Sequence, residues 1–231
     1  MIWIGTSGYN YPEWRGTFYP ADLPAKQMFV YYAARFSTVE INATFYRMPT
    51  TKTVSGWAEA APSGFVFVLK APQRITHFAR LRDVDEPLRF FCDAARLLGA
   101  HLGPLLFQLP PNFKKDVDRL ATVLVQIPRD LRSAWEFRHE SWFADDVYER
   151  LRARNAALCI ADTEEGATPA VATADFGYLR LRAVEYTDGD LARWVETIRT
   201  VGAGWRDASV FFKHEESGSG PELATRFARL V

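Results

Sequence analysis

The stretch Ala134-Trp135-Glu136-Phe137-Arg138-His139-Glu140-Ser141-Trp142 decides the fold of this chain. It begins as a β-strand in which the aromatic residues Trp135 and Phe137 alternate with the charged residues Glu136 and Arg138, and it continues into a polar loop. Because successive side chains of a strand point to opposite faces, both charges belong to the inward face. A buried face ends in charges only where partner charges or a ligand hold them. The same ending in other strands is therefore the main guide to the fold and the site.

Seven other segments have the same strand-like character and alternate with helical patterns. They cover residues 1–6, 38–42, 65–70, 104–109, 157–161, 176–182 and 208–213. Eight mostly apolar strands alternating with helices predict an α/β fold, a closed parallel (β/α)8 TIM barrel with short loops. Residues 163–175 lack a helical period, so we expect one irregular crossover between strands six and seven. At 231 residues, we expect a single domain over 1–231.

Composition excludes several classes of protein. The chain is 48% hydrophobic with a formal net charge of zero, so no global field attracts it to nucleic acid or to a membrane. Cys92 and Cys159 fit reduced core thiols, without a CxxC pair or a secretory context. No stretch has the length of a membrane span and no charged leader precedes the first strand. We expect a soluble cytoplasmic protein without a bound metal or cofactor.

The carboxyl ends of TIM-barrel strands surround one mouth, where active sites of this fold lie. The inward parity of each strand predicts that the mouth receives Glu40, Asn42, Lys70, Gln108, Glu136, Arg138, Asp162, Arg180, Arg182 and Lys213. Five basic residues against three acidic ones leave a positive excess, which favours an anion such as phosphate, sulfate or carboxylate. The alternative is a salt-bridge network that only neutralises buried charge. Such a network should balance, and this set does not.

Several motifs resemble those of a known family. They are Gly5-Thr6-Ser7-Gly8-Tyr9, Val39-Glu40-Ile41-Asn42-Ala43-Thr44-Phe45-Tyr46, Lys70-Ala71-Pro72 with Ile75-Thr76-His77, Phe107-Gln108-Leu109-Pro110-Pro111, Glu136-Phe137-Arg138-His139 with Ser141-Trp142, and Ala161-Asp162-Thr163. Together they resemble the YecE-like family, a domain of unknown function numbered 72, from the first strand to the last. The resemblance implies a TIM barrel and no settled activity. Many relatives carry a His-Gly after the seventh strand and an Asn-rich end to the eighth. This chain has Arg182-Ala183 and Lys213-His214 there, so no ligand is carried over from those relatives.

The leading hypothesis for the reaction is acid/base chemistry on a small anionic molecule, phosphorylated or carboxylated, with sugars among the candidates. Glu40 and Glu136 are the candidate catalytic pair, because a carboxylate beside apolar walls can keep its proton near neutral pH. His77 and His139 are further proton carriers, although a lone histidine is more often structural. The expected substrate-binding set is Asn42, Tyr46, Lys70, Gln108, Arg138, Asp162, Arg180, Arg182, Lys213 and His214.

Lys70 admits two roles. A buried lysine can be a Schiff-base nucleophile. With Glu40 or Asp162 expected opposite, however, its role as a charged partner of the ligand is favoured.

Two other functions stay open. Glu136, Asp162 and His214 could serve a metal-assisted, isomerase-like or phosphoesterase-like barrel, although the neighbouring arginines would repel a divalent ion. A nucleotide- or single-stranded nucleic-acid-binding protein would instead use aromatic rings of the first loop and of 45–46, with two arginines beside them. These residues are Tyr9, Tyr11, Trp14, Tyr19, Phe45, Tyr46, Arg15 and Arg47. Packing of these rings against the barrel is the simpler interpretation. The oligomeric state is not inferred.

Overall fold

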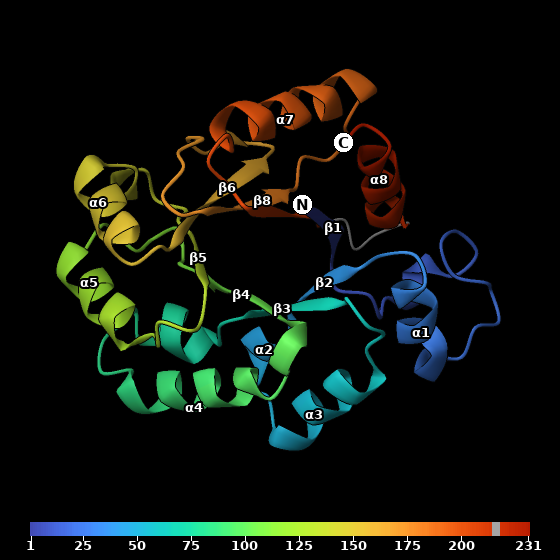
Figure 1. Cartoon of the computed structure of the whole chain (residues 1–231), viewed down its shortest axis with the longest axis horizontal. Helices are drawn as coiled ribbons and strands as arrows, with labels where there is room; N and C mark the ends of the chain where they lie inside the picture. Colours follow the sequence, from blue (N-terminus) through green and yellow to red (C-terminus); the bar gives the residue numbers. More distant parts are fainter. Residues whose placement is uncertain (214–217) are drawn as a thin grey trace.

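Parallel strands close into a barrel in the computed structural model, which describes residues 1–213 and 218–231 (Figure 1). The strands are β1 (Ile2–Ser7), β2 (Thr38–Ile41), β3 (Val66–Lys70), β4 (Leu102–Gln108), β5 (Ser133–Glu136), β6 (Ala157–Thr163), β8 (Phe176–Leu181) and β9 (Asp207–Phe212). Their order is β5-β4-β3-β2-β1-β9-β8-β6, and pairing of β5 with β6 closes the ring. The predicted TIM barrel is therefore confirmed.

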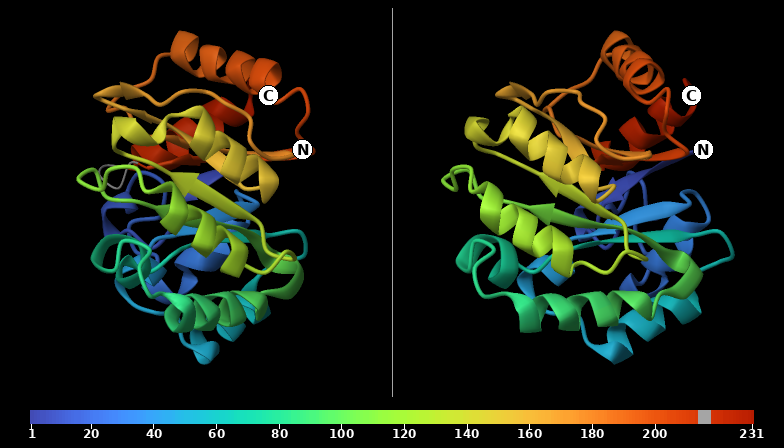
Figure 2. Two further views of the ribbon diagram at one scale, coloured as in Figure 1. Left: turned by 90° about the vertical axis from the view of Figure 1, so that its left-hand side faces the viewer. Right: turned by 60° about the vertical axis from the view of Figure 1, so that its left-hand side comes forward.

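Helices surround the strands on the outside, between successive strands (Figures 1 and 2). They are α1 (Met28–Ala33), α2 (Ala43–Tyr46), α3 (Thr51–Ala60), α4 (Asp85–Arg96), α5 (Val117–Gln126), α6 (Asp145–Ala153), α7 (Asp188–Val201) and α8 (Ser219–Ala228). Short helical turns are η1 (Pro12–Trp14), η2 (Ala25–Gln27), η3 (Arg74–Phe78), η4 (Gly99–His101) and η5 (Glu140–Trp142). The predicted irregular crossover is also confirmed. Between β6 and β8 the chain forms only the two-residue strand β7 (Gly166–Ala167), antiparallel to β6.

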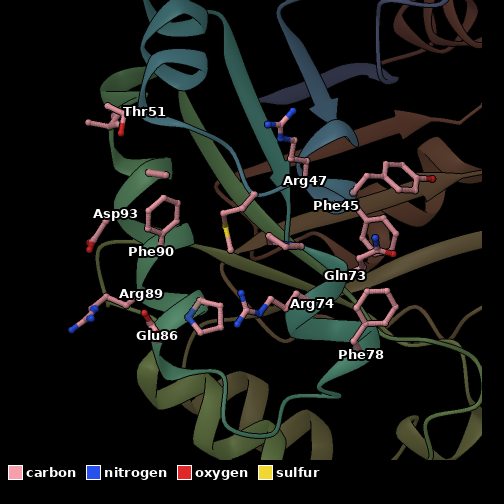
Figure 3. Close-up of a pocket in the computed structure, with 16 residues that line it drawn as sticks. Phe45, Arg47, Thr51, Gln73, Arg74, Phe78, Glu86, Arg89, Phe90 and Asp93 are labelled. Carbon is pink, nitrogen blue, oxygen red and sulfur yellow. The ribbon is translucent and has the colours of Figure 1, made fainter.

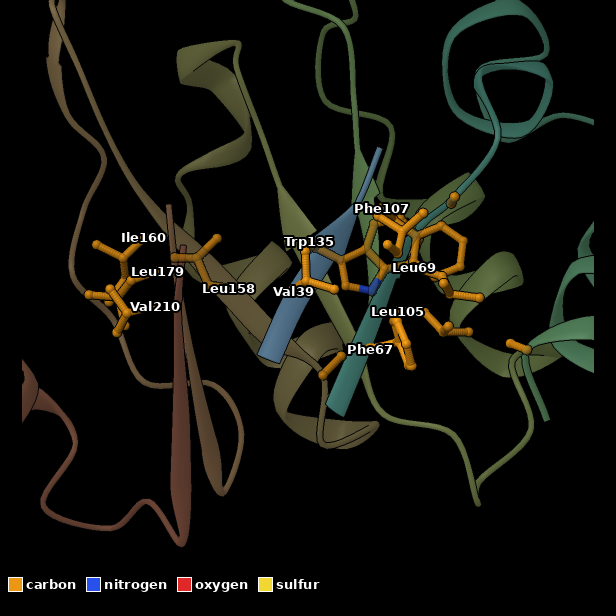
Figure 4. Close-up of a cluster of buried hydrophobic side chains, with 14 of the residues drawn as sticks. Val39, Phe67, Leu69, Leu105, Phe107, Trp135, Leu158, Ile160, Leu179 and Val210 are labelled. Carbon is orange, nitrogen blue, oxygen red and sulfur yellow. The ribbon is translucent and has the colours of Figure 1, made fainter. Parts of the chain in front are cut away.

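The outer faces of the strands pack against the helices in one continuous apolar core (Figure 4). Trp135 and Phe107 stack on neighbouring strands with ring centroids 4.7 Å apart, and Phe137 stacks on Trp142 at the same distance. The predicted outward parity of Trp135 and Phe137 is therefore correct. Burying aromatic side chains of this size supplies much of the driving force for folding.

The inside of the barrel is filled by a second cluster. Small side chains on β5 and β6 face larger ones on β8 and β9, and the cluster comprises Val68, Leu106, Ala134, Ala157, Cys159, Ala161, Phe176, Tyr178 and Phe211. This packing leaves a solid floor, as TIM-barrel interiors do. Polar residues one step further along each strand consequently lie on top of an apolar layer, at the carboxyl ends of the strands.

Two smaller predictions concern the cysteines and the membrane. Cys92 and Cys159 are both buried free thiols. Among the residues described, no helix is both long and apolar enough to cross a bilayer.

Candidate functional site at the carboxyl ends of the strands

A buried arginine joins two buried carboxylates at the centre of the barrel mouth. Arg180 of β8 donates from Nη2 to Oε1 of Glu40 on β2 at 2.8 Å, and from Nη1 to Oε2 of Glu136 on β5. Arg180 and Glu40 are both 0% exposed, and Glu136 is 1% exposed. Strand ends that are far apart in the sequence therefore meet at one point, as their common inward parity predicts.

Two hydroxyl groups complete the surroundings of Glu40. Ser7 Oγ donates to Oε1 at 2.7 Å, and the Tyr178 hydroxyl donates to Oε2 at 2.5 Å. Together with Arg180, these donors engage both oxygens of a carboxylate that water does not reach. Glu40 thus acts as an acceptor that orders its neighbours.

Glu136 holds a second layer that is nearer to solvent. Its Oε1 accepts from Gln108 Nε2 at 2.6 Å, from Arg138 Nε at 3.1 Å and from Arg182 Nη1 at 3.5 Å. The side chains of Arg138 and Arg182 keep 33% and 21% of their surface exposed. Glu136 Oε1 thus accepts hydrogen bonds from two guanidinium groups that remain partly exposed to solvent.

The electrostatics of the mouth follow from this arrangement. Burial alone would raise the pKa of Glu136, but the guanidinium groups of Arg180, Arg138 and Arg182 hold it well below its usual range. Burial lowers the pKa of Arg182; Glu136 opposes this effect, whereas the positive charges of Arg180 and Arg138 add to it. Glu136 therefore stays ionised at neutral pH, which argues against its use as a general acid.

Lys70 lies beside this network without joining it. Its Nζ lies 4.0 Å from the centroid of the Phe45 ring, and the residue is 8% exposed. Burial, followed by repulsion from Arg180, lowers the pKa of Lys70 to about 7. Lys70 forms no ion pair with Glu40 or Asp162, whose carboxylates accept hydrogen bonds from other groups.

His77 packs on the same aromatic ring. The imidazole and the Phe45 ring meet edge to face with centroids 4.8 Å apart, and Nδ1 lies 2.9 Å from the Thr76 hydroxyl. Burial, with a further contribution from the charge of Lys70, lowers the pKa of His77 to about 4. The ring is therefore neutral at pH 7, although its low pKa makes it a weaker base than an ordinary histidine.

Asn42 follows β2 directly and has an unusual environment. Its side-chain oxygen and nitrogen are both buried, and neither has a hydrogen-bond partner in the part of the chain that the structure describes. Leaving buried polar groups unpaired costs about 1–3 kcal/mol each, so such groups often mark a place where a ligand completes the bonding.

The predicted inward position of Asp162 is wrong. Ala157, Cys159 and Ala161 are the inward residues of β6, so Asp162 points to the outer side. There its Oδ2 accepts from the Tyr186 hydroxyl at 2.9 Å and from Trp194 Nε1 at 3.0 Å, which ties the end of β6 to α7 and to the loop before it. The simple alternation that was applied to the other strands starts one residue out of phase here.

Asp162 is therefore not placed with Glu136, as the metal-assisted alternative requires. The third residue of that alternative, His214, lies outside the described residues. Within the described ranges, no group of three His, Cys, Asp or Glu side chains could hold a metal ion.

Two other predicted residues lie at the margin of the mouth. His139 Nδ1 accepts from the backbone N–H of Ser141 at 3.2 Å, an interaction that orders the turn η5. Lys213 directly follows β9 and is half-buried. His139 thus has a local structural task, whereas its proposed proton transfer stays a prediction.

The aromatic first loop packs down onto the barrel. Trp14 and Tyr19 are buried in the main core, and the Tyr11 hydroxyl donates to the carbonyl of Ser7 at 2.8 Å. These rings therefore do not form an open stacking platform. Tyr46, by contrast, is 73% exposed.

Tyr46 borders a groove of about 950 Å³ between α2, α3, η3 and α4. Figure 3 shows Phe78 of η3 and Phe90 of α4 lining it, with Arg74 reaching into it from η3. Tyr46 is thus placed at this groove rather than in the network around Glu136.

Sequence reasoning missed two members of the site, Ser7 and Tyr178. Both follow the inward parity of their strands, and Tyr178 precedes Arg180 by two residues. Hydroxyl residues in the inward register were the available signal, but a charge count cannot detect them.

Comparison with known proteins agrees with this architecture. A family model described as "Protein of unknown function DUF72" matches residues 3–231. The UPF0759 protein YecE of Escherichia coli K12 is 30% identical over 151 residues, which is 65% of this chain and 53%, or about half, of that protein. The UPF0759 protein YunF of Bacillus subtilis is 26% identical, with 94% of this chain and 79% of that protein covered.

Solved structures give the same result for the fold. A DUF72 family protein from Thermotoga maritima superposes with a TM-score of 0.86 at 25% identity, covering 100% of this chain and 98% of that one. One from Enterococcus faecalis gives 0.80 at 19% identity, with 100% and 97% covered. With a family model that matches nearly the whole chain and relatives that share its barrel, this chain belongs to the DUF72 family of proteins of unknown function.

Proposed function

We propose that this protein binds a small anionic molecule at the carboxyl ends of its barrel strands and acts on it as an enzyme. The ligand class is a phosphate, sulfate or carboxylate ester or acid, with Arg138 and Arg182 as its principal contacts. A fixed, partly exposed pair of guanidinium groups suits such an anion because each can donate two parallel hydrogen bonds.

The observation that carries the proposal is the positive charge that remains after pairing among residues 1–213 and 218–231. Arg180 is surrounded by both carboxylates, yet Arg138 and Arg182 share the single oxygen Glu136 Oε1. In the part of the mouth that the structure describes, two carboxylates thus face three guanidinium groups and the amine of Lys70. A network that served only to neutralise buried charge would have no reason to leave cations on its solvent side.

The buried amide of Asn42 supports the same proposal. It follows the strand that carries Glu40, and a ligand with hydroxyl or carbonyl groups would satisfy its unpaired donor and acceptor. Polyfunctional molecules such as phosphorylated sugars or hydroxy acids have both kinds of group.

The division of chemical roles differs from the symmetric carboxylate pair expected from the sequence. Glu136 is held ionised, so its contribution is to orient and fix Arg138 and Arg182. The neutral imidazole of His77 is the better candidate for accepting a proton at pH 7. Glu40 supports Arg180 from below and is a positioning residue in this proposal.

Calorimetric titration with inorganic phosphate, sulfate and a panel of phosphorylated and carboxylated metabolites tests the proposal. Wild-type protein should bind at least one of them at one site per chain. Arg182→Gln should weaken binding about tenfold or more, the loss expected for one charge-assisted contact. Arg199→Gln, at an exposed arginine of α7, is the matched control and should change nothing. Equal binding by all three proteins, or none by any, contradicts the proposal.

A second candidate function rests on the groove beside α4. Tyr46, Phe78 and Phe90 expose their rings there, and Arg47 and Arg74 line the same groove. Exposed rings next to guanidinium groups suit unpaired nucleic-acid bases and their phosphates. Fluorescence anisotropy with single-stranded oligonucleotides at low salt tests this function. Loss of binding in a Phe78→Ala variant would support it, and no binding by the wild type would dismiss it.

A further inference from the structure

We propose that Lys70 forms an imine with the carbonyl group of the bound molecule, so that the substrates of this site are anionic aldehydes or ketones. This proposal rests on the proposed anion site, because Arg138 and Arg182 would hold the anionic group while Lys70 receives the carbonyl. It adds a nucleophile and a substrate class to that function.

The amine of Lys70 is buried at the barrel mouth without an ion pair to a described residue. Lys70 ends β3 on the inward face, next to the Arg180 network, and its Nζ rests 4.0 Å from the centroid of the Phe45 ring. Among residues 1–213 and 218–231, no carboxylate forms an ion pair with it. The face of the Phe45 ring attracts an ammonium, but burial without an ion pair favours the neutral, nucleophilic amine more strongly, as the lowered pKa of Lys70 shows.

Neither of the carboxylates expected opposite Lys70 is paired with it. Glu40 accepts from Ser7, Tyr178 and Arg180, and Asp162 faces the opposite side of its strand. Burial and the positive charges of Arg180 and Arg138 lower the pKa of Lys70, and together they outweigh the opposing effect of the carboxylates of Glu136 and Glu40.

These surroundings also explain the acid–base behaviour of the amine. With a pKa of about 7, roughly half of the Lys70 side chains are neutral at pH 7, whereas an ordinary exposed lysine is neutral in only about one molecule in a thousand or fewer. Lowering the pKa by burial and by a neighbouring cation is a known way to activate a lysine nucleophile.

The chemical step balances without any other reagent. The lone pair of Lys70 Nζ adds to the carbonyl carbon, and the C=O π electrons move to oxygen. The nitrogen then gives up its two protons to that oxygen, which leaves as water while the C=N bond forms. The neutral imidazole of His77, packed on the same Phe45 ring, is placed to relay a proton from nitrogen to oxygen.

Borohydride trapping tests this inference directly. Wild-type protein is mixed with pyridoxal 5′-phosphate, an aldehyde that carries a phosphate, and separately with pyruvate, and it is then reduced with sodium borohydride. Peptide mapping by mass spectrometry should place the reduced adduct on Lys70. The labelling rate there should exceed that at the exposed Lys26, Lys52 and Lys114 by about tenfold or more at pH 7.5, since far more of its amine is neutral.

Variants identify the source of the signal. Lys70→Met should lose the adduct, and so should Lys70→Arg, which replaces it if Lys70→Met does not fold. Lys52→Met is the matched control and should keep the adduct on Lys70. The rate of labelling at Lys70 should reach half of its maximum near pH 7. Adducts spread evenly over exposed lysines, or a rate that keeps rising above pH 9, overturn the proposal.

The same proteins separate this inference from the proposed anion site. Phosphate binding by calorimetry with no adduct at Lys70 would overturn the imine and leave the anion site in place. Labelling of Lys70 by the neutral aldehyde propanal, without phosphate binding and without an effect of Arg182→Gln, would refute the anion site. It would also overturn the inference as stated, because the substrates would then not be anionic.

Discussion

Replacing Arg180 with methionine is the sharpest test of how the mouth is held together. The variant leaves Glu40 and Glu136 buried without the cation that joins them, while the apolar floor below is unchanged. Removing one partner of a buried ion pair costs about 3–5 kcal/mol, because the remaining charge is uncompensated. Domains of ordinary stability have only about 5–15 kcal/mol in total. We therefore expect Arg180→Met to fold but to be markedly less stable.

Urea unfolding followed by circular dichroism and tryptophan fluorescence measures this loss. With a slope of about 2–3 kcal/mol per molar urea, the midpoint at pH 8 should fall by about 1–2.5 M. Arg199→Met is the control, since its ion pair with Glu196 is exposed on both sides and should contribute less than about 1 kcal/mol.

The loss should also depend on pH in a defined direction. In the wild type the pKa of Glu136 lies below its ordinary value of 4.5, so its contribution to stability is present above pH 4.5 and is lost as the pH falls further. Without Arg180, burial, which raises the pKa of Glu136, loses its largest opposing charge, so protonation of Glu136 relieves part of the cost as the pH falls. The difference between variant and wild type should thus shrink from pH 8 to pH 5.

Two results would refute this reasoning. One is an Arg180→Met variant within about 1 kcal/mol of the wild type at pH 8, since a buried network of this kind should cost more to break. The other is an equal loss at both pH values. The triple variant Glu40→Gln, Glu136→Gln, Arg180→Met should recover most of the stability, because it removes the unpaired charges as well.

Three further predictions follow from single positions. Burial lowers the pKa of Lys70 from 10.5 to about 7, so its charge destabilises the fold below pH 7, and this cost fades as the pH rises toward 10.5. Lys70→Met should therefore raise the free energy of unfolding by at most about 5 kcal/mol at pH 6 and by almost nothing at pH 10. Thermal unfolding at the two pH values measures this difference. Gly5→Ala should destabilise the protein by about 2 kcal/mol or more in urea unfolding, since the added Cβ would lie 2.2 Å from the carbonyl oxygen of Thr38; a neutral effect would mean that β1 and β2 can separate. Asp162→Asn should lower the free energy of unfolding by about 1–3 kcal/mol, because it weakens the hydrogen bond from Trp194. It should leave phosphate affinity unchanged in calorimetry, and a loss of affinity would show that Asp162 belongs to the anion site.

The fold could be predicted from the sequence because its signals are local and repeated. Period-two alternation around Trp135 and Glu136 fixes which face of β5 is inward, and closure of the barrel then follows from the number of such strands. The resemblance in motifs gave the same fold independently. Even the crossover without a helix could be predicted, since residues 163–175 show no helical period.

The arrangement within the site could be predicted only in part. Parity brought Glu40, Glu136 and Arg180 to one place, but it gave no information on which charges would pair. It failed for Asp162, where the apolar strand is in the opposite phase. The hydrogen bonds of this residue come from Tyr186, in the loop before α7, and from Trp194 in α7. Contacts that depend on side-chain length and on distant elements, such as those of Lys70 with Phe45, are not encoded in any local pattern.

One measurement addresses the central claim directly, namely that the strand ends form an anion site. Crystals soaked in selenate, a tetrahedral anion with an anomalous signal, would reveal where such an ion binds. The account predicts an anomalous peak in contact with the guanidinium groups of Arg138 and Arg182, and the loss of that peak in Arg182→Gln. Peaks confined to exposed arginines elsewhere, with the mouth empty, would contradict it.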